Sequence, residues 1–424
     1  MSGEKVLLVC DSLEGPTGFA NNGLGIAWAL AKEFDVSVLG LQSWNRNEVR
    51  ITYEGEERRV IQYPNVPRKR DTEWDFGFLS LPRLLDELEP DILLTINDIQ
   101  MVQHIPNILC PDSINLKVVD LPARKFLSDD AIRMQLEGKI ESFKEKYPRN
   151  TKWVMLAPQD GEPPIPNWKF IYSMADKVVA MSRYGQMVFK KYFNMDVPYI
   201  WHGVDGEIFR PEEKPEEFQK YFVVGDINRN QPRKQPIRVI QAFAKFAKNK
   251  DDVRLWLQKD WNDRFGWPLS YFVNIYGISD KIIPPKQVGM SRREVAKVYN
   301  CWDVNLMATG GEGFGLPFIE GFLCGKPTIT VKYTTGEELV TYGNPKPRGL
   351  FAKYSLHWQR LDVAAVQRSL VDVDDLAKQM EKYYNDRELL AKHGENAEIW
   401  ARRNVTMKKL QWKWIDLIKE VLNT

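Results

Sequence analysis

Two glutamates in one glycine-rich stretch are the first residues of this sequence whose spacing suggests chemistry. The stretch Gly310–Pro327 reads GGEGFGLPFIEGFLCGKP and places Glu312 and Glu320 eight positions apart. Loop glycines let backbone N–H groups approach a ligand closely, and the N-terminus of a following helix favours phosphate. Carboxylates repel phosphate, so the two glutamates are better suited to accept hydrogen bonds from hydroxyls. A nucleotide sugar carries hydroxyls on both sides of its diphosphate.

The residues around these carboxylates predict the elements that would position them. Pro317 suits the first turn of a helix, because its missing N–H would have no partner there. Gly325 is suited to end that helix, and Thr328–Val331 (TITV) is typical of the next strand. With a strand at Val304–Met307, the predicted order is strand, loop, short helix, strand. The first glutamate then lies in the loop and the second on the helix.

A basic loop in the same half of the chain is the second candidate site. Arg229, Arg233 and Lys234 lie between a strand pattern at Tyr221–Val224 and a helix pattern at Pro236–Lys248. A loop that leaves a strand and opens a helix often binds phosphate, so these side chains predict an anion site. A solvated basic turn is the alternative interpretation.

The first half of the chain offers Asp160 as its strongest catalytic candidate. It lies in the segment Pro158–Pro164 (PQDGEPP), directly after a strand pattern at Thr151–Ala157. A carboxylate there could orient a hydroxyl or accept its proton, but Asp-Gly pairs are also common in turns. His202, which follows another apolar strand, is better explained as a packed residue than as a catalyst.

The chain opens with a βαβ pattern that also predicts a binding loop. Lys5–Cys10 is typical of a buried strand, a helix is expected over about Gly23–Phe34, and Gly18 lies in the loop between them. Ligands of α/β proteins bind at the carboxyl ends of such strands, so Gly18 is a candidate binding residue. The glycine spacing does not fit a dinucleotide fingerprint, and no nicotinamide cofactor is expected.

Length and composition set broad limits on the protein. A chain of 424 residues suits two domains, and a net charge of +2 gives no field that favours nucleic acid or acidic polymers. The four cysteines are scattered and only four histidines are present, so neither a disulfide framework nor a metal site is indicated. No signal peptide or membrane-length apolar run is visible, and a cytoplasmic location is expected.

The motif around the two glutamates resembles a known family signature. The pattern Glu-Gly-Phe-Gly-Leu-Pro-x-x-Glu is similar to that of the retaining glycosyltransferases with the GT-B fold, family four, also called glycosyl transferases group 1. The resemblance implies that Glu312 contacts the donor sugar and Glu320 the ribose. The donor diphosphate would be held by the loop between them, which consists of Gly313, Phe314, Gly315 and Leu316.

The same resemblance extends to the basic loop and the first half of the chain. It implies that Arg229 and Lys234 neutralise the diphosphate, without a metal or other cofactor. The segment His202–Pro211 resembles the family's interdomain hinge. Many relatives carry a histidine or an acid near the strand end where this chain has Gln159 and Asp160 and no histidine. The role of that histidine therefore does not transfer to this sequence.

The fold implied by the resemblance is α/β, with two doubly wound Rossmann-like domains facing across a cleft. The expected division is an acceptor domain at 1–205, a nucleotide-sugar donor domain at 206–404, and a last helix at about 405–424 that packs back on the first domain. The implied activity is sugar transfer of the hexosyltransferase type to an acceptor hydroxyl, with retention of configuration. Asp160 and Glu312 would be the catalytic residues.

Several points stay open at this stage. The donor could be a UDP-, GDP- or ADP-sugar, selected by a pocket around Pro284–Val288, and the acceptor a glycan, lipid, protein or modified nucleobase. The polar segment 123–147 has a modest excess of bases, which indicates a solvated face or a contact with an acceptor or a membrane surface. An epimerase or phosphorylase of the same fold, and a non-catalytic nucleotide-sugar-binding module, are the alternative functions.

Overall fold

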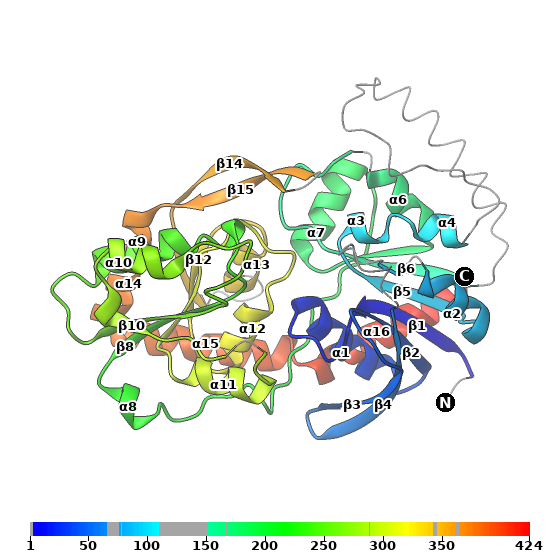
Figure 1. Cartoon of the computed structure of the whole chain (residues 1–424), viewed down its shortest axis with the longest axis horizontal. Helices are drawn as coiled ribbons and strands as arrows, with labels where there is room; N and C mark the ends of the chain where they lie inside the picture. The colour runs from blue at the N-terminus through cyan, green and yellow to red at the C-terminus, as the bar shows by residue number, and fades with distance from the viewer. Residues whose placement is uncertain are drawn as a thin grey trace.

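The computed structural model describes residues 3–65, 76–77, 79–109, 151–166, 168–287, 289–341, 346–361 and 364–424. These residues form two α/β lobes, each built on its own sheet, which lie side by side (Figure 1). The predicted α/β fold with parallel sheets is confirmed. The polar segment 123–147 and Val288 lie outside the described residues.

The first sheet has seven strands and is parallel except at one edge. Its order is β3 (Asn47–Tyr53), β4 (Glu56–Pro64), β2 (Asp35–Leu41), β1 (Lys5–Asp11), β5 (Ile92–Ile96), β6 (Lys152–Ala157) and β7 (Lys177–Ala180). Only β3 and β4 pair antiparallel, around a tight turn at Glu54 and Gly55 with positive φ angles of 48° and 80°. The central strand β1 ends beside β5, so their carboxyl ends open on the same edge.

Helices cover both faces of this sheet because the buried strands are apolar on both sides. Val6, Leu8 and Cys10 face one hydrophobic cluster, while Leu7 and Val9 face another. The helices of this lobe are α1 (Gly18–Leu30), α2 (Ser80–Leu88), α3 (Ile99–Val102), α4 (Ile105–Leu109), α6 (Trp168–Met174), α7 (Arg183–Val188) and the π-helix η2 (Phe189–Phe193). The first helix begins at Gly18 rather than near Gly23, because the Thr17 hydroxyl accepts a hydrogen bond from Ala20 N and caps it.

The second sheet is parallel throughout. Its order is β10 (Ile282–Ile283), β9 (Val253–Gln258), β8 (Phe222–Ile227), β11 (Val304–Met307), β12 (Thr328–Val331) and β13 (Gly349–Ala352). The accompanying helices are α8 (Glu216–Gln219), η3 (Pro232–Lys234), α9 (Pro236–Phe246), α10 (Leu269–Ile275), η4 (Ser279–Lys281), α11 (Arg292–Asn300), α12 (Leu316–Leu323), α13 (Thr335–Thr341), α14 (Val373–Asn385) and α15 (Arg387–Asn404). Because β8 and β11 are neighbours, the loops that follow them meet at one edge.

An antiparallel hairpin follows the second sheet and was not expected from the sequence. It consists of β14 (Tyr354–Leu361) and β15 (Ala364–Val371). Figure 1 shows it extending from the second lobe over the gap towards α7 of the first. Its second strand reaches the first lobe, where Gln367 forms an isolated β-bridge with Glu162.

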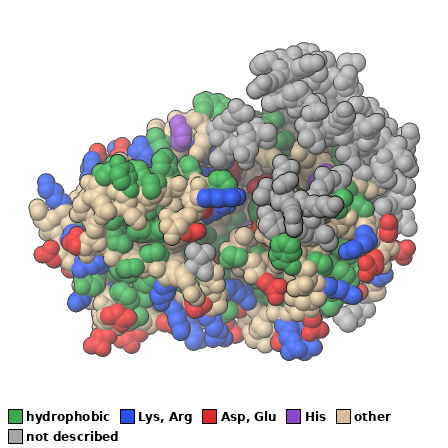
Figure 2. Space-filling view, in the orientation of Figure 1, with side chains coloured by type: hydrophobic (Ala, Val, Ile, Leu, Met, Phe, Trp, Pro, Cys, Tyr) green, Lys and Arg blue, Asp and Glu red, His purple; other side chains and the backbone are tan. Residues whose placement is uncertain are grey.

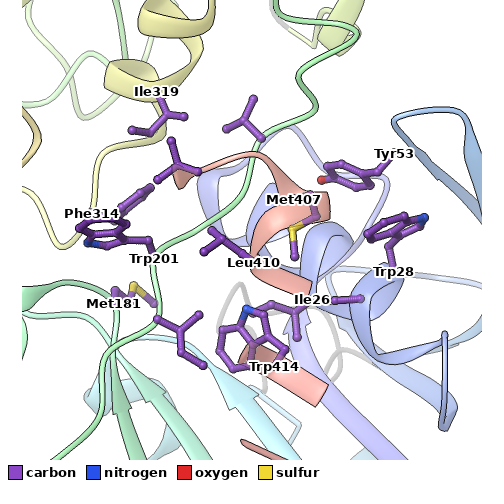
Figure 3. Close-up of a cluster of buried hydrophobic side chains, with 14 of the residues drawn as sticks. Ile26, Trp28, Tyr53, Met181, Trp201, Phe314, Ile319, Met407, Leu410 and Trp414 are labelled. Carbon is purple, nitrogen blue, oxygen red and sulfur yellow. The ribbon is translucent and has the colours of Figure 1, made fainter. Parts of the chain in front are cut away.

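The last helix, α16 (Met407–Leu422), returns to the first lobe and packs against α1. Its Met407, Leu410 and Trp414 are buried in the same cluster as Ile26 and other side chains of α1 (Figure 3). That cluster continues through Trp201 to Phe314 and Ile319 of the second lobe. One hydrophobic core therefore joins both lobes and the end of the chain.

A buried carboxylate also fastens the two lobes together. Glu338, on α13, accepts hydrogen bonds from the backbone N–H groups of Arg183 and Tyr184 at 2.9 Å each. These N–H groups begin α7 in the other lobe, so Glu338 caps that helix from outside it. Its Oε1 also accepts a hydrogen bond from Trp201 Nε1 at 2.6 Å.

Basic and acidic side chains are interspersed over the face shown in Figure 2. In the part of the chain that the structure describes, no helix combines the length and the apolar character needed to span a membrane.

We predict that Glu338→Ala lowers the free energy of unfolding by about 3 kcal/mol, because it leaves buried donors of the first lobe without their charged acceptor. Glu337→Ala is the matched control, since the neighbouring Glu337 is exposed and pairs with Lys332 at the surface. Thermal unfolding measures both variants. Equal melting temperatures for the two variants would show that the interlobe cap contributes nothing.

Candidate active site

The glycine-rich motif folds as the sequence predicts. The loop leaves β11, and α12 begins at Leu316 with Pro317 in its first turn. Gly315 precedes the helix with φ of 94°, and Gly325 follows it with φ of 70°; both conformations favour glycine. Glu312 accordingly lies in the loop, and Glu320 projects from the helix.

The loops after β8 and β11 meet in a buried ion cluster centred on Glu312. Lys234 Nζ pairs with Glu312 Oε1, and Arg233 Nη1 lies 3.1 Å from Glu312 Oε2. Both glutamate and lysine are less than a tenth exposed. The backbone N–H of Glu312 donates to Thr334 Oγ1 at 3.0 Å, which fixes the loop. Lys234 and Arg233 thus lie on either oxygen of one buried carboxylate, and two adjacent cations can bind a phosphate.

The charges in this cluster alter one another's titration. Burial alone would raise the pKa of Glu312, but the charges of Lys234 and Arg233 outweigh it and lower this pKa to about 2. Burial and the neighbouring Arg233 lower the pKa of Lys234 to about 8, although Glu312 opposes the change. At neutral pH the carboxylate is therefore ionised, and the lysine is mainly protonated.

Asp160 faces this cluster from the other lobe. Its Oδ1 lies 2.9 Å from Arg368 Nη1, on β15, and its Oδ2 lies 3.6 Å from Arg233 Nε. The lobes approach so closely that a Cβ on Gly311 would lie 2.1 Å from the Asp160 carbonyl oxygen. Asp160 therefore lies in direct contact with the motif that contains Glu312.

Glu320 lies on α12, in an environment different from that of Glu312. Its Oε2 accepts a hydrogen bond from the Tyr299 hydroxyl at 2.9 Å. It lines a narrow cleft between the lobes with Leu316, Arg292 and, from the first turns of α1, Asn21. Burial raises the pKa of Glu320 to about 7, against the opposing effects of Tyr299 and Arg292.

Other residues singled out in the sequence lie farther from this cluster. Arg229 pairs with Asp263 at 2.9 Å and is largely exposed, so Arg233 rather than Arg229 accompanies Lys234 beside Glu312. Phe314 is buried, and its ring meets that of His202 edge-on at 5.1 Å. Burial lowers the pKa of His202 to about 3, so its ring is neutral at physiological pH.

The remaining glycines of the candidate site are Gly18 and Gly313. Gly18 is the exposed first residue of α1, with open space where a Cβ would stand. Gly313 lies against the loop of the first lobe, where a Cβ would approach Pro158 Cβ at 3.2 Å. The structure thus places Gly313 at the contact between the lobes and Gly18 at the N-terminal end of α1.

Two residues near Asp160 escaped the sequence analysis. Asp98 follows β5, and burial raises its pKa to about 6; Asp160 adds to this effect, while Arg233 and Arg368 oppose it. The Asn97-Asp98 pair at a strand end was a visible signal for this position. Arg368 had none, because its place depends on a hairpin that reaches the other lobe.

The described residues contain no group of three or more His, Cys, Asp or Glu side chains arranged to hold a metal ion. The cations beside Glu312 are the side chains of Arg233 and Lys234. Such cations stabilise negative charge that develops on a leaving group.

Comparison with known proteins defines the class. The family model described as Glycosyl transferases group 1 matches residues 206–400. No curated protein matches the chain at a significant level.

Solved structures resemble the chain over its full length. A sucrose-phosphate synthase from Thermosynechococcus elongatus superposes with a TM-score of 0.68 at 15% identity, covering 99% of each chain. A glycosyltransferase from Rickettsia africae ESF-5 gives 0.65 at 14% identity, covering 100% of this chain and 99% of that one. The Anabaena protein HepE, solved with UDP and glucose, gives 0.64 at 15% identity, covering 98% of this chain and 100% of that one.

The two lobes and their arrangement are thus those of the GT-B fold. Because the second lobe carries a glycosyl transferases group 1 domain, the protein is a glycosyltransferase, an enzyme of sugar transfer.

We predict that Glu320→Gln flattens the pH dependence of stability between pH 4.5 and 7. The native pKa of Glu320, about 7, exceeds its ordinary value of 4.5, so the native protein keeps a proton that the unfolded chain releases. The stability from this group is complete below pH 4.5 and is lost as the pH rises through 7. At pH 8 the variant should therefore melt higher than the wild type.

Thermal unfolding from pH 4 to pH 8 measures this effect, with the exposed Glu337→Gln as control. If the melting temperatures of Glu320→Gln and wild type changed with pH in parallel, the raised pKa of Glu320 would be contradicted.

Proposed function

We propose that the enzyme transfers a hexose from a nucleotide-diphosphate sugar to an acceptor hydroxyl, with retention of configuration and without a metal. The observation that carries this proposal is the buried cluster of Lys234, Arg233 and Glu312, with Asp160 facing it from the other lobe. A donor diphosphate that binds at this cluster would take the place of the Glu312 carboxylate as the anion paired with Lys234 and Arg233. A uridine donor is the first to test, because HepE was solved with UDP and glucose.

Each side chain then has one task. Lys234 and Arg233 neutralise the diphosphate as it leaves, and the released Glu312 carboxylate accepts a hydrogen bond from a donor-sugar hydroxyl. Glu320, which is close to half-protonated at neutral pH, can accept from or donate to the ribose hydroxyls. Asp160 orients the acceptor hydroxyl. All of these contacts except that of Asp160 come from the second lobe.

The reaction needs no further reagent. The bond between the anomeric carbon and the diphosphate oxygen breaks as the acceptor oxygen bonds to the same face of that carbon. The acceptor proton passes to the leaving phosphate oxygen, so charge and atoms balance. Turnover with a panel of UDP-, GDP- and ADP-sugars tests the proposal against an epimerase, a phosphorylase and a binding module, none of which would glycosylate an acceptor from a nucleotide sugar.

We predict that Asp160→Asn keeps the affinity for the nucleoside diphosphate but lowers kcat by about 100-fold, because it removes an interaction with the acceptor. Lys234→Ala should weaken nucleotide binding and lower kcat together. Steady-state kinetics and calorimetry with the panel's best donor measure both effects. The exposed Asp196→Asn and Lys245→Ala are matched controls. Wild-type turnover in Asp160→Asn would reduce Asp160 to a turn residue.

We predict further that turnover persists in excess EDTA, because side-chain cations take the place of a metal at the diphosphate. Proton NMR of the first product should show the same anomeric configuration as the donor. Activity that disappears with EDTA and returns with magnesium or manganese would refute the metal-free mechanism, and an inverted product would refute retention.

A further inference from the structure

The strand β15 is attached to both loops of the donor site. Ser369 N donates to Gly310 O at 3.1 Å and Ser369 Oγ to Thr309 O at 2.8 Å, which joins the strand to the start of the glycine-rich loop. The Gln235 side chain, directly after Lys234, bonds Ser369 O at 2.9 Å and Val371 N at 3.0 Å. The hairpin therefore has a fixed position relative to the ion cluster.

The same strand also contacts the loop of the other lobe that contains Asp160. Gln367 N donates to Glu162 O at 2.9 Å, while Tyr333 Oη, from the second lobe, donates to Gln367 O at 2.7 Å. One residue farther along, Arg368 is 4% exposed. Its Nη1 contacts both the Asp160 carbonyl and Oδ1, the latter at 2.9 Å. A single guanidinium thus holds the backbone and the side chain of Asp160.

The ion pairs form a continuous chain across the cleft. Arg368 contacts Asp160, Asp160 contacts Arg233, and Arg233 shares Glu312 with Lys234. Two of these cations, Arg233 and Lys234, lie beside Glu312, where a diphosphate would engage them. Arg368 pairs with Asp160 beside Gly311, and this pair would remain when those two cations turn to the donor.

We propose that Arg368 is a positioning residue, which holds Asp160 in the orientation that the acceptor needs. This inference rests on the proposed function, because it gives Asp160 its acceptor role. With Oδ1 occupied by Arg368, Oδ2 is the oxygen directed towards the reacting centre and Arg233. Arg368 contacts no substrate in this arrangement and acts through Asp160.

The test compares Arg368→Met, which removes the charge, with Arg368→Lys, which keeps it but loses the forked geometry. Arg368→Met should lower kcat by about 10- to 100-fold, because a displaced catalytic group has an effect of this size. Arg368→Lys should recover part of that loss. The Kd of the nucleoside diphosphate, measured by calorimetry, should stay within about twofold of wild type. Trp358→Ala, at a 61% exposed position on β14, is the hairpin control.

A double-mutant cycle separates positioning from general damage to the hairpin. In an Asp160→Asn background, Arg368→Met should lower kcat no further. An equal loss in both backgrounds would overturn the inference, and so would wild-type kcat in Arg368→Met. If Arg368→Met fails to fold, the same cycle is run with Arg368→Lys.

The outcomes also distinguish this inference from the function on which it rests. A silent Asp160→Asn refutes the role of Asp160 itself. A damaging Asp160→Asn beside a silent Arg368→Met refutes only the positioning role.

Discussion

A buried carboxylate between a buried lysine and a partly buried arginine is the constraint on which the rest of the site depends. Lys234 and Arg233 keep the buried Glu312 ionised in this structure, and each cation would be costly to bury alone. The loops after β8 and β11 are therefore held together by charge. The adjacency of these two strands in a parallel sheet is what makes the contact possible. A ligand with two negative charges is the natural replacement for the carboxylate.

The surroundings of the two glutamates shift their pKa values in opposite directions, although both belong to one short motif. Cations lower the pKa of Glu312, whereas burial raises that of Glu320. Two glutamates eight positions apart thus provide one fixed acceptor of hydrogen bonds and one carboxyl that can either accept or donate. Such a pair suits a ligand whose two ends need different hydrogen bonding. The difference arises from the partners of each residue, not from residue type.

Local patterns in the sequence were sufficient for the α/β class, the motif loop and the short helix that ends just before Gly325. Proline, glycine and apolar spacing determine such features over a few residues. The contact between Arg368 and Asp160 spans more than 200 positions, and no local pattern encodes it. The sequence predicted Arg229 as the partner of Lys234, whereas the structure places Arg233 beside Glu312, and the reason is similar. Spacing placed both arginines in one loop, but Asp263 on another loop draws Arg229 to the surface.

The return of α16 to the first lobe has a consequence for the order of folding. Three side chains of α16, those of Met407, Leu410 and Trp414, are buried against α1 of the first lobe. Lys152 Nζ, also in the first lobe, donates to the Val421 carbonyl of α16 at 2.9 Å. During synthesis α16 leaves the ribosome long after α1. The first lobe therefore exposes apolar surface on α1 until α16 has been made, and such surface is what chaperones bind. Completion of the first lobe depends on the synthesis of α16.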